Sequence, residues 1–232
     1  MTLGPVLALG FFLGMRHATD ADHVVAVSTI VSRTRTLRAA APIGILWGIG
    51  HTLTILLVGA AIILFGVVIP ARLGLGMEFC VALMLILLGG LNLRNAVRPA
   101  AAQHEHHEHH EHHGHSHAHA AGHLSVRPLF VGIVHGLAGS AAVALLVLGT
   151  IHEPFWALGY LAVFGVGTIA GMLLITLAMA MPIAASTRRF ERAQLVLAIA
   201  TGLASVGFGT FLVYDLGFVH GLFSTHPQWT PE

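Results

Sequence analysis

The chain has no lysine, a single cysteine and few charged residues of either sign. Only 9% of its 232 residues are charged, whereas 56% are apolar and the mean hydropathy is +0.82. A soluble protein of this size needs a charged surface, and this chain cannot form one. The composition therefore predicts an integral membrane protein whose solvent is mainly the lipid bilayer.

Other absences exclude several classes of function. Cys80 alone excludes internal disulfides and cysteine-based zinc sites, and its apolar surroundings predict a packed side chain. The chain has no basic patch for nucleic acid and no Gly-x4-Gly-Lys motif of an ATPase. No apolar stretch contains the His-Glu-x-x-His motif of a metalloprotease. We expect no enzyme, no prosthetic group and no nucleic-acid partner.

Six apolar stretches are long enough to cross a bilayer, which takes about 20 helical residues. They cover residues 3–32, 42–69, 73–95, 126–150, 155–182 and 192–218. As one straight helix the first would measure about 45 Å, against a hydrocarbon core of about 30 Å. We therefore expect an all-α protein with six transmembrane helices, the first of them kinked or broken near Gly10 and Gly14.

Arginine placement predicts the orientation of these spans. Nine arginines lie in the loops after the first, third and fifth spans, whereas the other two loops contain only Arg72. By the positive-inside rule the arginine-rich loops are cytoplasmic and both termini are outside. The N-terminal stretch lacks the basic region of a signal peptide, so we expect a retained helix in a bacterial-type cytoplasmic membrane.

The two halves of the chain resemble each other. Residues 47–57 align without gaps on 164–174, and residues 13–15 resemble 135–137. With three spans per half, the second copy is inverted relative to the first, as in secondary transporters that bind substrate near the midplane. This divides the chain into a first repeat (1–95), a cytoplasmic loop (96–125), and a second repeat with a short outer tail (126–232). Chance alignment of glycine-rich apolar helices is the alternative explanation.

Five ionisable residues crowd into the first span: Arg16, His17, Asp20, Asp22 and His23. Charged groups inside a membrane are costly and mark functional sites. Neutral imidazoles are the usual ligands of nickel, cobalt, copper and zinc, whereas a magnesium or calcium site would use oxygen ligands. The cluster therefore predicts a binding site for a divalent transition metal in transit.

The ligand set of this site has two solutions. In a regular helix, at about 100° per residue, His17, Asp20 and His23 share one face and Asp22 points to the opposite side. If the helix unwinds, His17, Asp22 and His23 converge instead. One aspartate could also bind the metal while the other orients a histidine.

Residues outside the first span complete the candidate site. His51, between Gly50 and Thr52, is the expected remote ligand, because a transport site needs ligands from more than one element. Arg16 is expected to pair with an aspartate or to anchor the helix. The remaining candidates line the pathway or serve in packing: Met15, Thr52, His135, Ser140 and Thr168.

Eleven of the 18 histidines lie in the loop between the third and fourth spans, interleaved with glutamate and glycine. The tract has too few apolar residues to fold and is expected to be disordered. We expect it to act as a metal buffer, sensor or delivery arm in the cytoplasm, with an inert spacer as the alternative. Its histidines are His104, His106, His107, His109, His110, His112, His113, His115, His117, His119 and His123.

The motifs His17-(x4)-Asp22-His23 and Gly50-His51-Thr52 resemble the signatures of the nickel/cobalt transporter family. The resemblance implies that His17, Asp22, His23 and His51 select and pass the metal. Longer family members have eight spans and further acidic motifs. The six-span form with a His-rich loop resembles the urease-accessory branch.

Together these features predict a permease that moves Ni²⁺, with Co²⁺ as a second substrate, inward across the membrane. Cytoplasmic nickel chaperones would then be its partners. The alternatives are a Ni²⁺/Co²⁺ efflux protein and a membrane metal donor for maturation of a nickel enzyme such as urease. Transport direction and the preference between the two metals are open at this point.

Overall fold

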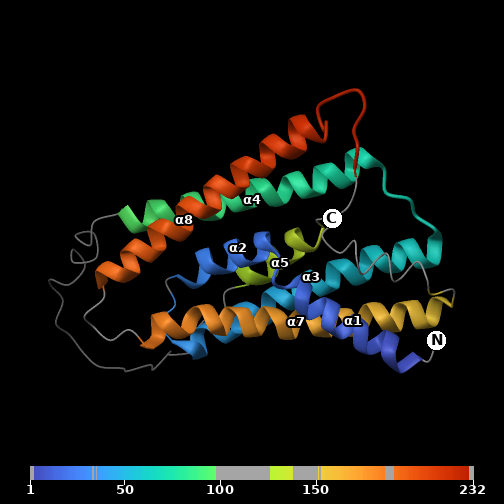
Figure 1. Ribbon diagram of the computed structural model, residues 1–232, viewed down its shortest axis with the longest axis horizontal. Coiled ribbons are helices and arrows are strands. Elements are labelled where there is room, and N and C mark those ends of the chain that lie inside the picture. The colour runs from blue at the N-terminus through green and yellow to red at the C-terminus, as the bar shows by residue number, and fades with distance from the viewer. Residues whose placement is uncertain are drawn as a thin grey trace, which may run out of the picture.

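The computed structural model describes residues 3–32, 34, 36–97, 126–137, 151, 153–185 and 191–229. Within these residues the protein contains helices and no strands (Figure 1). The helices are α1 (Leu3–His17), α2 (Ala21–Val31), α3 (Leu37–Phe65), α4 (Ala71–Val97), α5 (Arg127–Gly136), α7 (Pro154–Ala185) and α8 (Glu191–Tyr214), the last extended by the π-helical turn η3 (Asp215–Val219).

Four of the described helical segments are long and apolar enough to span a membrane. They are Leu37–Phe65, Ala71–Val97, Pro154–Pro182 and Gln194–Val219. They correspond to the predicted second, third, fifth and sixth spans and confirm an all-α, multi-pass membrane protein. Of the predicted fourth span, α5 forms the beginning, and residues 138–150 lie outside the described part.

The outer surface of the bundle is apolar, as lipid solvation requires. Large side chains are exposed on different helices, such as Leu57 on α3, Leu87 on α4 and Phe211 on α8. Cys80 is exposed on α4, so the expected packed position of this thiol is wrong. The error has a physical cause: in a membrane protein an apolar environment includes the lipid-facing surface, which hydropathy does not distinguish from the core.

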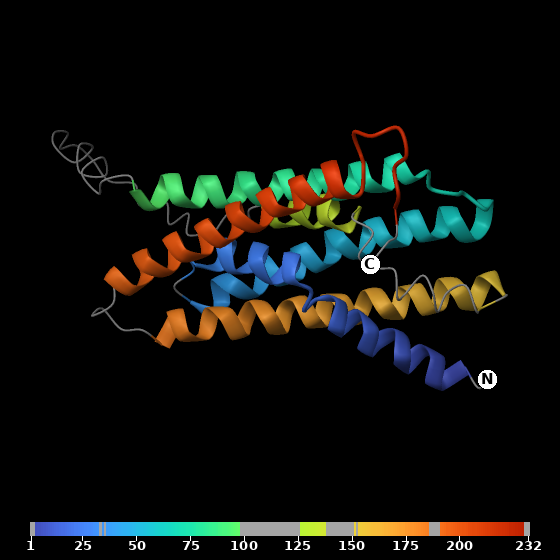
Figure 2. The same ribbon diagram turned by 45° about the horizontal axis from the view of Figure 1, so that its top comes forward.

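The first apolar stretch is broken, as expected from its length. α1 ends at His17 and α2 begins at Ala21, and between them Asp20 has an extended backbone (φ −60°, ψ 148°). Figure 2 shows α1 leaving the bundle at an angle to α2. The break confirms the prediction of a broken first helix, but its expected place near Gly10 and Gly14 is wrong. Both glycines lie inside α1 and serve its close packing on α7.

End caps, rather than hydropathy, set the limits of α3. The Thr36 side chain accepts a hydrogen bond from the Ala39 backbone N–H at 3.2 Å and starts the helix. Gly66, in the left-handed region at φ 61°, ends it. The helix therefore begins and ends several residues before the apolar stretch 42–69.

Glycines bring the helix backbones into direct contact. α1 packs on α7 through Gly14, where a Cβ would lie 3.0 Å from the Phe164 carbonyl carbon. α5 packs on α3 through Gly132, where a Cβ would lie 2.9 Å from the Trp47 carbonyl carbon. Small residues at such crossings are how membrane helices gain close packing.

The contacts between the two halves occur in matched pairs. Gly132 lies 118 positions after Gly14, and Phe164 lies 117 positions after Trp47. The resemblance of residues 13–15 to 135–137, which paired Gly14 with Gly136, is therefore in the wrong register. Two further glycine contacts have a matched counterpart: Gly167 meets Phe11 O as Gly50 meets Leu129 O, and Gly48 meets Ile169 as Gly165 meets Thr52. Between α4 and α8, Asn92 donates to Ala198 O as Ser205 donates to Leu85 O. In each pair, the two partners exchange roles between the halves.

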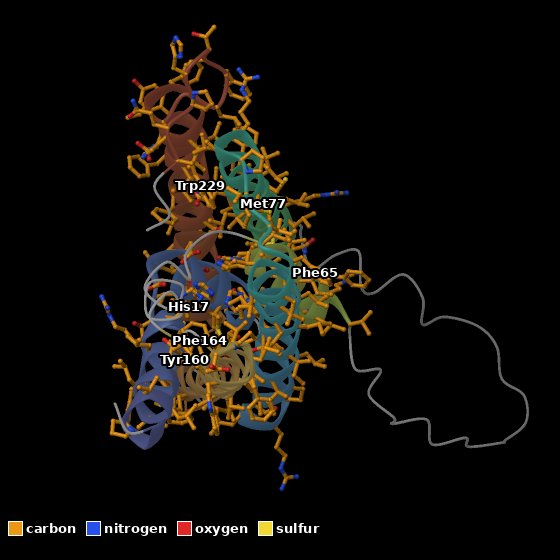
Figure 3. All side chains as sticks on the ribbon, turned by 90° about the vertical axis from the view of Figure 1, so that its right-hand side faces the viewer. His17, Phe65, Met77, Tyr160, Phe164 and Trp229 are labelled. Atoms are coloured by element: carbon orange, nitrogen blue, oxygen red, sulfur yellow. The ribbon has the colours of Figure 1, made fainter. Side chains whose placement is uncertain are left out.

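The C-terminal tail folds back onto the start of α4. The Trp229 Nε1–H donates to Glu78 Oε1 at 2.8 Å, and its ring covers Gly74. Figure 3 shows Trp229 and Met77 near each other and at a distance from His17. The tail thus caps the α4 end of the bundle, well away from the polar cluster of the first span.

The glycine contacts generate a stability prediction. Gly132→Ala should lower the thermal unfolding midpoint of the detergent-solubilised protein, since its Cβ meets backbone of α3 and overpacking costs about 1–3 kcal/mol. Gly159→Ala on α7 is the matched control, because no atom lies within 4 Å of that Cβ. The control should be unchanged or slightly stabilised. Equal midpoints for the two variants would contradict the close α3–α5 packing.

Candidate metal centre

The break between α1 and α2 brings two histidines of the first span together. His17 ends α1, His23 lies in the first turn of α2, and their ring centroids are 4.8 Å apart. The extended backbone of Asp20 changes the chain direction between them, so the two rings meet without lying on one face of a continuous helix. The regular-helix alignment of His17, Asp20 and His23 is therefore not the arrangement that forms.

His51 of α3 joins this pair. Its Nε2 lies 2.9 Å from the Nε2 of His17, and its ring centroid is 5.0 Å from that of His23. His23 and His51 are fully buried, and His17 is 5% exposed. One ligand atom from each of the three lies within 4.8 Å of the others. Three separate helices thus place imidazole nitrogens around one small volume.

The two aspartates hold the outer nitrogens of these rings. Asp20 Oδ2 lies 2.8 Å from His17 Nδ1, and Asp22 Oδ1 lies 2.9 Å from His23 Nδ1. Carboxylate–imidazole pairs of this kind fix the ring orientation of metal-binding histidines and increase their basicity. In both cases the opposite nitrogen, Nε2, is directed away from the carboxylate. Asp20, although in the N-cap position of α2, makes no capping hydrogen bond with its side chain.

His135 of α5 is a fourth buried imidazole in the cluster. Its Nε2 lies 2.7 Å from Asp22 Oδ2, and its ring centroid is 4.2 Å from that of His23. Asp22, His23 and His135 form a second group with ligand atoms within 4.8 Å of one another. The sequence left His135 open between pathway and hydrogen-bond partner, and the structure places it in contact with the first-span motif.

Several ring nitrogens of the cluster are buried without a hydrogen-bond partner among the described residues. They are His23 Nε2, His51 Nδ1 and His135 Nδ1. An unsatisfied buried polar atom costs about 1–3 kcal/mol, so such atoms indicate a missing ligand or water. Buried imidazole nitrogens with neighbouring carboxylates suit a borderline divalent ion such as nickel, cobalt or zinc.

Two aromatic rings that the sequence analysis did not assign to the site flank the cluster. Trp47 stacks at 6.5 Å from His23 and lies 5.6 Å from His135, and Phe164 lies 5.6 Å from His17, beside it in Figure 3. Both rings are essentially unexposed. The alignment of residues 47–57 on 164–174 starts at these two residues, and it was the signal available in the sequence.

The other predicted residues take different positions. The Thr52 hydroxyl donates to Gly165 O at 3.1 Å and the Thr168 hydroxyl to Phe164 O at 3.0 Å, so both serve in packing. Met15 is half-buried, and its backbone faces Gly171. Arg16 is exposed on α1, and the ion-pair contacts of the two aspartates are with histidines.

Some of the predicted site lies outside the described residues. Ser140 and all the histidines of the loop from His104 to His123 are in this group. Neither metal-ligand group found in the described part contains Asp20. The geometry therefore gives Asp22, and not Asp20, a place in a ligand group, together with His23 and His135, beside the group His17, His23 and His51.

Comparisons with known proteins match nearly the whole chain. Residues 22–204 match the family described as cytochrome C biogenesis protein transmembrane region. The urease accessory protein UreH of Bacillus sp. (strain TB-90) is 38% identical over 220 residues, covering 94% of each chain. No solved structure matches significantly. The two descriptions, a transmembrane region and an accessory protein, agree with the expectation that the chain is not an enzyme.

Trp47 provides a local reporter of the centre. A Ni²⁺ or Co²⁺ ion held by His23 would lie beside the indole and should quench its fluorescence, and Trp47→Phe should abolish this quenching. Asp20→Asn should raise the metal concentration required by about 10–100-fold, since it removes the partner that orients His17. Asp215→Asn is the matched control, because its carboxylate pairs with His220 outside the cluster at 3.2 Å. Equal quenching curves for the two aspartate variants would contradict the role of Asp20.

Proposed function

The chain belongs to the cytochrome C biogenesis transmembrane-region family and is a homologue of urease accessory protein UreH. We propose that it is a secondary transporter for Ni²⁺, with Co²⁺ as a second substrate. One observation carries the proposal: three fully or nearly buried histidines from α1, α2 and α3 converge within a multi-pass membrane protein. A structural role alone does not require imidazole nitrogens without partners in a membrane interior.

The donor set supports the choice of ion. Imidazole nitrogens favour the later first-row metals. The His17–His23–His51 group consists of imidazoles alone, without the thiolates of a soft copper site or the several oxygen ligands of a magnesium site. The relative's name links that protein to urease, a nickel enzyme. Nickel is therefore the first substrate of the proposal, and His17, Asp22, His23 and His51 are the residues that select and pass it.

We place the centre between two inverted repeats of three spans each, residues 1–95 and 126–232. The matched contacts support this plan. A two-fold axis would relate the α1–α7 contact to the α5–α3 contact, and it would relate α3 to α7 and α4 to α8. The plan assigns a fourth span to α5 and the residues after it, and a first span to the broken pair α1 and α2. Transporters of this type bind substrate where the repeats meet.

Alternating access follows from this plan. Trp47 of α3 and Phe164 of α7 occupy matched positions beside different histidines of the cluster, Trp47 at 5.6 Å from His135 and Phe164 at 5.6 Å from His17. When the halves rock against each other, one of these two rings would move away from the histidines while the other stays in contact with them. The centre would then open to one side of the membrane at a time. A membrane potential of about 100 mV favours inward movement of a divalent ion by roughly 4–5 kcal/mol, so no ATPase domain is needed.

The arginine pattern orients the proposed permease in a cytoplasmic membrane. Both termini and the tail carrying Trp229 would be outside, and loop 96–125 would be cytoplasmic. Its histidines would receive the ion after passage and hand it to cytoplasmic nickel chaperones. This role would make the loop an accessory to transport rather than part of the centre.

Two other functions each have a supporting observation. A cytoplasmic histidine tract also suits metal capture before efflux, which would reverse the direction. The relative's description as an accessory protein also suits a membrane metal donor that transports nothing. Both alternatives share the metal centre and differ only in flux.

Nickel flux into proteoliposomes tests the proposal. His51→Ala should reduce flux to background because it removes a ligand, and Asp22→Asn should reduce it about 10–100-fold by removing the orienting carboxylate. His220→Ala, outside the cluster, is the control and should transport normally. Wild-type flux in both cluster variants would disprove the site assignment, and metal binding without flux in the wild type would favour the donor.

Whole-cell accumulation of radiolabelled nickel tests the direction. Expression of the protein should raise the cellular nickel content, since the potential drives cations inward. The His51→Ala protein, expressed to the same level, is the control and should leave the content unchanged. A lower nickel content on expression of the active protein would exclude the importer and establish efflux.

A further inference from the structure

We propose that the transport path contains a second cation position, formed by Asp22, His23 and His135, to which the ion passes from the His17–His23–His51 position. The inference rests on the proposed function and deepens it: the centre becomes two consecutive positions joined by His23. Neither signature motif of the first repeat includes His135.

The second position has the properties of a ligand group. One ligand atom from each of Asp22, His23 and His135 lies within 4.8 Å of the others. His135 is fully buried, and its Nδ1 has no partner among the described residues. Two imidazoles and a carboxylate offer a mixed nitrogen and oxygen set with one negative charge, which suits a borderline dication.

His23 stands between the two positions. Its Nδ1 lies 2.9 Å from Asp22 Oδ1, while its Nε2 is buried and unpartnered. Its ring centroid is 4.2 Å from that of His135 and 5.0 Å from that of His51, whereas these two rings are 6.2 Å apart. One imidazole thus belongs to both groups. Two dications on one ring would repel strongly, so the positions fill alternately.

The order of the positions follows from the first span, which runs from outside to inside in the proposed topology. His51 and His135 lie at about the same level, because Gly132 and Gly136 of α5 both meet the His51 backbone. His17 ends α1, whereas Asp22 lies further along the span, in the first turn of α2. The second position, which contains Asp22 in place of His17, is therefore nearer the cytoplasm.

The second position joins the two halves of the protein. His135 lies 118 positions after His17, at the same separation as the matched glycines Gly14 and Gly132, so it is the counterpart of His17. Its carboxylate partner, Asp22, comes from the first half at 2.7 Å. Rocking of one half against the other would therefore assemble or separate this position, whereas the first position lies wholly within the first half.

Thiolate reporters test the two positions one at a time. Cys substitution at His51 reports on the first position, and His135→Cys and Asp22→Cys report on the second. With Co²⁺ as the probe, a thiolate ligand gives a ligand-to-metal charge-transfer band that the loop histidines cannot produce. The controls are the wild type, whose Cys80 is exposed on α4, and Thr176→Cys, equally buried but outside the cluster.

The expected result is a charge-transfer band in His51→Cys and in at least one second-position variant, with none in the controls. A band in His51→Cys alone would overturn the second position and leave the proposed function intact. Absence of the band from all three cluster variants would instead remove the metal centre on which the proposed function depends.

A flux measurement adds a second criterion. His135→Asn retains an N–H donor toward Asp22 but has no imidazole, so it separates ligation from orientation of the carboxylate. Nickel flux in proteoliposomes should fall at least about tenfold, the lower bound seen when a metal centre loses a supporting group. Wild-type flux in this variant would overturn the second position as part of the path.

Discussion

Burial of four imidazole rings away from water is the constraint on which the rest of the structure depends. Each ring nitrogen in a membrane interior must have a hydrogen-bond partner or a ligand. Asp20 pairs with the outer nitrogen of His17, and Asp22 pairs with one nitrogen each of His23 and His135. The Nε2 atoms of His17 and His51 face each other, and the remaining three ring nitrogens have no partner among the described residues. The break in the first helix makes this possible, because an unbroken helix would turn Asp22 away from the cluster.

Close backbone packing supplies the second requirement. Imidazole side chains are short, so the four rings meet only because glycines bring α1 close to α7 and bring α3 close to α5 and α7. These helix crossings are matched between the halves, and they also bring Trp47 and Phe164 next to the histidines. Packing and proposed gating thus use one set of contacts, which connects substrate binding to movement of the halves.

Much of this arrangement could be predicted from the sequence. The length of the first apolar stretch and its buried charges predicted the break, and the Gly50–His51 pair predicted the remote imidazole. The alignment of His17, Asp20 and His23 on one face requires a regular helix. It does not form, because the backbone at Asp20 is extended and the helix is broken there. His135 stood in an apolar stretch with no acidic neighbour in sequence, so its partner could come only from another helix.

The sequence by itself determined the class of protein, the helical spans and the residue types of the candidate site. Hydropathy and ionisable groups in apolar stretches are local properties, and the cost of burying charge is the same in any fold. Only the tertiary structure decided which aspartate faces which histidine, that Asp22 bridges His23 and His135, and that Trp47 and Phe164 flank the cluster. The Asp22–His135 and His17–Phe164 contacts join residues more than a hundred positions apart, and helix crossings rather than periodicity bring them together.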